Sequence, residues 1–144
     1  MLADGTRLVT TDEHTLLQIP PSGRLATVAG TATAAQDEAE DEDEEGNNER
    51  RTQSGFLDAT GTRARFHGPY GLTVDKAGSV VVVDGNNNAI RTVSKVGAVV
   101  STLAGNGEAG SADGQGVDAT FNDPTDVVLA ANGDLLLSDT RSAW

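Results

Sequence analysis

Residues 69–84 read PYGLTVDKAGSVVVVD, and residues 124–139 read PTDVVLAANGDLLLSD. The two stretches lie 55 positions apart and share one order of features: a proline, an apolar run, a glycine turn, a second apolar run and a closing aspartate. When the comparison is extended to residues 55–84 and 110–139, eight of 30 positions are identical without a gap. A fixed period of this length is the signature of a repeat architecture, in which each repeat is one supersecondary unit.

The apolar runs of the repeat are short and rich in β-branched residues, and none shows the 3.6-residue spacing of an amphipathic helix. We expect strands at residues 70–75, 79–84, 89–94 and 98–103, with glycine turns at 76–78 and 95–97. Four short antiparallel strands and a glycine-rich connection are typical of one β-propeller blade. The predicted fold class is therefore all-β: a partial β-propeller of four-stranded antiparallel blades, with an acidic disordered insertion.

The first residues form a further copy that begins partway through the repeat. Residues 2–12 match residues 129–139 in pattern, which places Asp12 at the position of Asp84 and Asp139. The predicted organisation is a partial blade at 1–30, a complete blade at 55–105 and a partial blade at 106–144. The insertion occupies residues 31–54, and residues 37–45 hold eight of the 22 acids. Such a block repels itself and buries nothing, so we expect it to be disordered, with docking of a basic partner as the functional alternative.

The composition excludes several classes of function. The 144 residues carry a formal net charge of −12, which argues against binding to nucleic acid or to an anionic membrane surface. The chain contains no cysteine, so disulfides, zinc–thiolate sites and cysteine nucleophiles are excluded. The lack of cysteine, together with a first segment unlike a secretory leader, favours an intracellular setting.

The repeat resembles the NHL-repeat family of β-propellers over everything except residues 31–54. The residues that carry the resemblance are Asp58, Ala64-Arg65-Phe66, Pro69-Tyr70-Gly71-Leu72-Thr73-Val74-Asp75, Gly78, the strand ending at Asp84, Ile90-Arg91 and Val100-Ser101-Thr102-Leu103-Ala104-Gly105. The Asn-His-Leu tripeptide that names the family reads Asn87-Asn88-Ala89 here, so any role of that histidine is lost.

Propellers that this repeat resembles mostly serve as protein-interaction platforms, and we expect a non-catalytic scaffold without a cofactor. Six blades at this period need about 330 residues, so we expect the chain to be part of a larger propeller. The partners it implies are unidentified proteins and further propeller blades, supplied by the same longer chain or by self-association. The alternative is part of a propeller hydrolase, lactonase or lyase with a central divalent metal such as calcium.

Candidate site residues follow from these two interpretations. The metal interpretation points to Asp84, Asn86 and Asp139, which lie after second strands, although an aspartate that recurs in each blade more often caps loop backbone. The scaffold interpretation points to the exposed loops between strands, with the interaction residues Asp12, His14, Asn86, Asn87 and Asn88. His14 and His67 fall at different phases of the repeat and are interpreted as surface residues, while Phe66 and Phe121 are expected to anchor the core between blades.

A metal titration separates the two interpretations. A scaffold without a metal site keeps the same melting temperature when calcium or zinc is added to chelator-treated protein. A propeller enzyme with a central ion melts at a higher temperature, because an ion that binds only the folded state stabilises it. An upward shift that saturates with metal concentration contradicts the scaffold interpretation.

Overall fold

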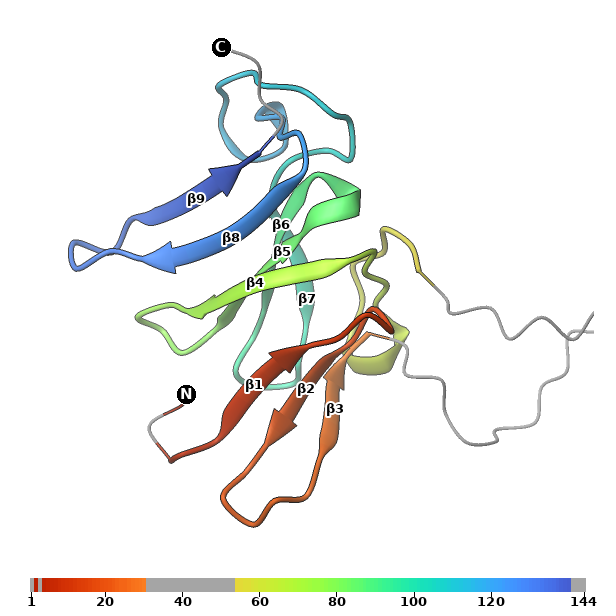
Figure 1. Cartoon of the computed structure of the whole chain (residues 1–144), viewed down its shortest axis with the longest axis vertical. Coiled ribbons are helices and arrows are strands. Elements are labelled where there is room, and N and C mark those ends of the chain that lie inside the picture. Colours follow the sequence, from red (N-terminus) through yellow and green to blue (C-terminus); the bar gives the residue numbers. More distant parts are fainter. Residues whose placement is uncertain (1, 3, 31–53, 141–144) are drawn as a thin grey trace, which may run out of the picture.

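A computed structural model describes residue 2 and residues 4–30 and 54–140 of the chain, so the predicted disorder of the acidic insertion lies outside the described residues. The strands form three separate antiparallel sheets, which follow one another along the chain (Figure 1). We call these sheets blades 1, 2 and 3. No helix of the described residues is long and apolar enough to cross a membrane.

Blade 1 contains β1 (Arg7–Thr10), β2 (Leu16–Ile19) and β3 (Ala26–Ala29). Blade 2 contains β4 (Pro69–Val74), β5 (Val80–Asp84), β6 (Ala89–Val93) and β7 (Val100–Ala104). Blade 3 contains β8 (Pro124–Leu129) and β9 (Leu135–Asp139). The four strands expected in the complete repeat are confirmed with small changes at their ends. The predicted all-β propeller fold is likewise confirmed.

Three short 3₁₀ helices lie in the connections. They are η1 (Gly61–Arg63), η2 (Gly85–Asn87) and η3 (Gly116–Asp118). η1 and η3 occupy the same place in consecutive repeats, and each begins with a glycine at positive φ. We call residues 55–66, which enter blade 2, the lead segment.

The core lies between neighbouring blades. Strand β5 places Val80 and Val82 in the cluster that faces blade 1, and Val81 and Val83 in the cluster that also contains Val127 of blade 3. Since successive residues of a strand point to opposite faces, a run of four valines supplies both interfaces. This explains why β5 is apolar throughout instead of alternating.

The phenylalanines of the repeat pack where they were expected. Phe66 is fully buried together with Leu16 and Ala29 of blade 1. Phe121 packs against the second cluster, between blades 2 and 3. Each phenylalanine therefore anchors its repeat on the preceding blade.

Each blade joint also depends on a glycine. Gly105 has φ of +88°, and an added Cβ would lie 2.4 Å from the carbonyl oxygen of Asn88 and 3.1 Å from the ring of Phe121. Gly30 makes the same approach to His14 and Phe66. Gly55 and Gly110 occupy the same position in consecutive repeats, and neither adopts positive φ. Glycine is required there because the Arg65 side chain lies close to Gly55 and the Thr120 side chain lies close to Gly110, which leaves little room for a Cβ.

Two glycine substitutions separate backbone strain from steric exclusion. Gly23 has φ of +78° but no atom within 4 Å of an added Cβ, so Gly23→Ala costs only the left-handed conformation, about 1–2 kcal/mol. Gly105→Ala adds a clash with backbone, and we expect a total loss of about 2–5 kcal/mol. Urea unfolding measures both values. Equal losses for the two variants would contradict the close approach at Gly105.

Candidate functional site

Arg91 on β6 is a charged side chain with 0% exposure, and its partner Asp84 is buried to the same extent. Its Nη1 donates to Asp84 Oδ2 at 2.7 Å and to the carbonyl of Arg65 at 3.1 Å. Its Nε donates to Asp58 Oδ1 at 3.1 Å, and Nη2 donates to the same oxygen. A guanidinium removed from water needs hydrogen-bond partners, and these contacts give each of its three nitrogens at least one.

Two aromatic rings complete the surroundings of the guanidinium. The central carbon of Arg91 lies 4.9 Å from the ring centre of Phe56 and 5.2 Å from that of Phe66. Both distances suit attraction between a cation and a π face. Since both rings come from the lead segment, Arg91 attaches that segment to the strands of blade 2.

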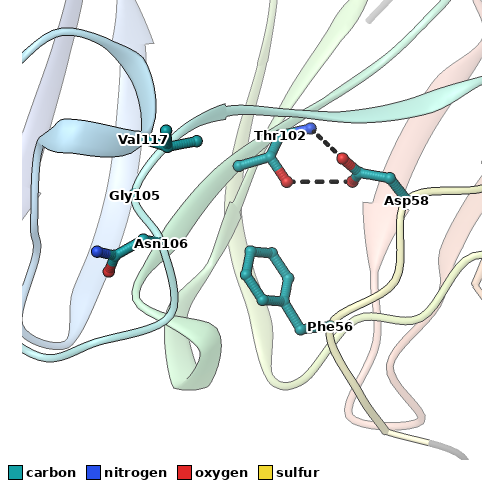
Figure 2. A pocket seen from close by; sticks show the side chains of 6 residues that line it. All are labelled: Phe56, Asp58, Thr102, Gly105, Asn106 and Val117. Atoms are coloured by element: carbon teal, nitrogen blue, oxygen red, sulfur yellow. Dashed lines mark hydrogen bonds between the residues drawn. The ribbon is translucent and has the colours of Figure 1, made fainter.

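Asp58 extends this attachment to the outer strand of the blade. Its Oδ2 accepts from the backbone N–H of Thr102 at 2.9 Å, and its Oδ1 accepts from the Thr102 hydroxyl at 3.1 Å (Figure 2). One half-exposed carboxylate therefore joins β6 and β7 to the lead segment. The resemblance pointed to Asp58 and Arg91 as repeat residues, but no local pattern showed that they meet across 33 positions.

Asp84 closes the network at the end of β5. Besides Arg91, it accepts from the N–H of His67 at 2.7 Å and from Asn87 Nδ2 at 2.8 Å. Burial raises the pKa of the Asp84 carboxyl, while these hydrogen bonds and the Arg91 charge act in the opposite direction. Every buried side-chain nitrogen and oxygen in the described residues has a hydrogen-bond partner.

The same backbone contact recurs in blade 3. Asp139 accepts from the N–H of Asn122 at 2.9 and 3.1 Å, as Asp84 accepts from the N–H of His67. Asp84 and Asp139 thus both hold the backbone that leads into the inner strand. This is the structural role expected for an aspartate that recurs in each blade.

Blade 1 does not continue this pattern, and the predicted equivalence of Asp12 with Asp84 is wrong. Asp84 pairs with Ala89 across a loop of four residues (85–88). In blade 1 the backbone N–H of Thr11 donates to Thr15 across a loop of three residues (12–14). The shorter loop places Thr11 at the position of Asp84.

The arginine is replaced in blade 1 as well. Leu17 pairs with Val9, as Arg91 pairs with Val82, so Leu17 occupies the arginine position. Both charges of the pair are therefore replaced together in this blade. This agrees with a contact in which neither buried charge is tolerated without the other.

The three candidate metal residues are not gathered into one site. Asp84 is enclosed by its hydrogen-bond donors, and Asp139 lies in the next blade. The side chain of Asn86 lies against Gly68. Among the described residues, no group of three or more histidine, cysteine, aspartate or glutamate side chains could hold a metal ion.

Two of the predicted interaction residues also hold neighbouring backbone. Asn87 Nδ2 donates to the carbonyl of Gly55 at 2.8 Å, and Asn88 Oδ1 accepts from the N–H of Asp123 at 3.0 Å. Asn86 and Asp12 are exposed. His14 and His67, both interpreted as surface residues, are partly buried against each other, and Nδ1 of His14 accepts from the N–H of Gly68 at 3.0 Å.

A shallow pocket of about 370 Å³ lies beside the arginine network. The lead segment, β7 and the crossing into blade 3 all contribute to it, with the lining residues Phe56, Asp58, Thr102, Gly105, Asn106 and Val117 (Figure 2). Phe56 is 42% exposed and Val117 is 56% exposed. Asp58 and Asn106 supply polar groups beside these apolar side chains, so the pocket can accept an apolar group next to a hydrogen-bond donor.

Sequence reasoning did not find this pocket, because its lining residues come from three separate stretches of the repeat. Among the lining residues, Phe56 was the one that could have indicated the pocket from the sequence. It is an aromatic residue without a counterpart in the next repeat, where position 111 is serine. An aromatic residue present in one repeat and absent from another indicates a feature of that blade alone.

No protein-family model matches the chain. Curated proteins do: the chain is 36% identical over 91 residues to NHL repeat-containing protein 2 of Bos taurus, a match that covers 61% of this chain and 12% of that protein. It is 30% identical over 89 residues to the Arabidopsis thaliana protein SUPPRESSOR OF QUENCHING 1, chloroplastic, covering 62% of this chain and 8% of that protein. The chain thus spans about a tenth of the length of these relatives.

Solved structures show the same fold. A crystal structure of a structural genomics protein of unknown function from Bacteroides thetaiotaomicron aligns with 94% of this chain and 30% of its own, with a TM-score of 0.75 and 26% identity. An auxiliary nutrient binding protein from the same organism aligns with 94% of this chain and 32% of its own, with a TM-score of 0.66 and 22% identity.

Removal of the Arg91 charge tests the network. In Arg91→Met the Asp84 carboxylate stays buried without its cation, and we expect a loss of about 3–5 kcal/mol in the free energy of unfolding. The control Arg63→Met removes an exposed arginine from η1 and should change stability by no more than about 0.5 kcal/mol. Urea unfolding measures both. A loss below about 1 kcal/mol for Arg91→Met would contradict the buried network.

Proposed function

Because the chain is built of β-propeller blades of the NHL-repeat type, we propose that it is a non-catalytic scaffold that binds a protein partner at the pocket beside Asp58. The observation that carries this proposal is the exposure of Phe56 and Val117 on two sides of a preformed hollow. A few anchor residues, most often aromatic, that pack into such a hollow supply most of the energy of many protein interfaces.

The chemistry of the pocket suggests the kind of contact that a partner makes. Phe56 and Val117 favour an aliphatic or aromatic side chain of the partner, whereas Asp58 and Asn106 favour a neighbouring N–H donor. A peptide segment offers both groups within one or two residues. The network behind the pocket fixes Phe56 and Asp58 before binding, and a preorganised surface loses little entropy when the partner docks.

The use of the acidic side chains also supports a scaffold. Asp58 and Asp84 both bind Arg91, and Asp84 and Asp139 both hold backbone N–H groups. A general acid or base needs a carboxyl group within reach of a substrate proton. Asp84 is fully buried, so it is placed to stabilise the blade.

Peptide selection followed by affinity measurement tests the proposal. Peptides selected from a random displayed library on the full chain are expected to contain an apolar anchor and to bind with a dissociation constant below about 100 µM, which corresponds to roughly −5.5 kcal/mol. Val117→Glu places a charge in the pocket and should weaken binding at least tenfold.

The matched control is Val96→Glu. Val96 is 83% exposed in the turn between β6 and β7, at the end of β7 opposite the pocket. This variant should bind as the unaltered chain does, and both variants should keep their melting temperature. Equal weakening by the two substitutions, or no selected peptide that binds, would overturn the proposal.

A further inference from the structure

His14 and Asn88 occupy the same place in consecutive blades. Each is the last residue of the loop before the strand that follows, and each has positive φ, 61° and 46°. The carbonyl of each lies against a blade-closing glycine, Gly30 behind His14 and Gly105 behind Asn88. The two residues are therefore structural equivalents, although the sequence period did not align them.

The two side chains make the same hydrogen bond to the next blade. Nδ1 of His14 accepts from the backbone N–H of Gly68 at 3.0 Å. Oδ1 of Asn88 accepts from the backbone N–H of Asp123 at 3.0 Å. Gly68 and Asp123 are 55 positions apart, so they are the same position of the repeat. One acceptor thus links blade 1 to blade 2, and the other links blade 2 to blade 3.

The two acceptors differ in their response to acid. An amide oxygen keeps its lone pairs across the physiological pH range, whereas a neutral imidazole has one acceptor nitrogen and loses it when protonated. Protonated His14 would point an N–H of its own at the N–H of Gly68. This hydrogen bond from Gly68 is therefore available only to the neutral histidine.

The surroundings of His14 favour the neutral form. Burial lowers the pKa of His14 below its ordinary value, and the ring of His67, 5.4 Å away, lowers it further, while Asp84 and Asp12 act in the opposite direction. Glu13 is the remaining titratable side chain of its loop. Since the folded pKa lies below the unfolded value of about 6.5, the unfolded or detached state binds the proton first. The contribution of the contact to stability is complete above that pH, and it is lost as the pH falls through the lower pKa of the folded state.

We propose that His14 is a pH-sensitive latch that loosens the joint between blade 1 and blade 2 in mild acid, while the Asn88 joint between blade 2 and blade 3 does not respond to pH. The device goes beyond the proposed binding function and does not depend on it. Its effect is local, because the equivalent joint in the same molecule carries an acceptor that does not titrate. A drop in pH therefore weakens one joint and leaves the other unchanged, although the two have the same backbone geometry.

Amide hydrogen exchange measured by NMR on the full chain tests the latch. The two readouts are the protection factors of the Gly68 and Asp123 amides, each corrected for the intrinsic exchange rate at the pH of measurement. Between pH 7.5 and pH 5.0 we expect the protection of Gly68 to fall at least tenfold and that of Asp123 to change less than twofold. Equal behaviour of the two amides, or constant protection of Gly68, would overturn the proposal.

Two variants assign the effect to the histidine. His14→Asn copies the residue of the other joint, and it should keep Gly68 protected at both pH values. His67→Asn copies Asn122, its counterpart in the repeat, and it should leave the latch in place with its midpoint at higher pH, because a neighbour that lowers the pKa of His14 is removed. Loss of Gly68 protection in acid that persists in His14→Asn would contradict the assignment, and the wild-type comparison of Gly68 with Asp123 stands whether or not the variants fold.

Discussion

The buried guanidinium of Arg91 constrains the rest of blade 2. A charge with no exposed surface is stable only when its donors and its charge are both compensated, and Asp84, Asp58 and the carbonyl of Arg65 together do this. These partners come from β5 and from the lead segment, so they can meet only if the lead segment crosses the strands at one place. The conformation of residues 55–66 is therefore fixed by the arginine more than by its own local preferences.

The surface features follow from this arrangement. With the lead segment fixed, Phe56 and Asp58 lie beside Thr102 and the crossing into blade 3, and the pocket forms between them. The joints between blades contain a second repeated contact, in which the side chain of a loop residue at positive φ accepts a hydrogen bond from the backbone of the following blade. Blade 1 uses a histidine there and blade 2 an asparagine, so a single difference between repeats changes the chemistry of one joint without changing its geometry.

The fold could be predicted because the period of 55 residues carries the strands, the turns and the two phenylalanines with it. The site could not be predicted in the same way, since Asp58 and Arg91 lie 33 positions apart and hydrogen bonds over such distances leave no local pattern. The error at Asp12 has a definite cause: a loop one residue shorter moves Thr11 to the aspartate position, and pattern matching followed the nearest acid instead. The partly buried position of His14 was missed for the same reason, because its equivalence with Asn88 becomes visible only from backbone contacts.

A double-mutant cycle between Arg91 and Asp84 tests the central claim most directly. The free energy of unfolding is measured in urea for the unaltered chain, Arg91→Met, Asp84→Asn and the double variant. Because loss of the arginine leaves a buried carboxylate without its cation, removing that charge should restore stability, and Arg91→Met with Asp84→Asn should be more stable than Arg91→Met alone by at least about 1 kcal/mol. Losses that add to within about 0.5 kcal/mol would show that the two charges act independently, and would contradict a buried pair in which each charge compensates the other.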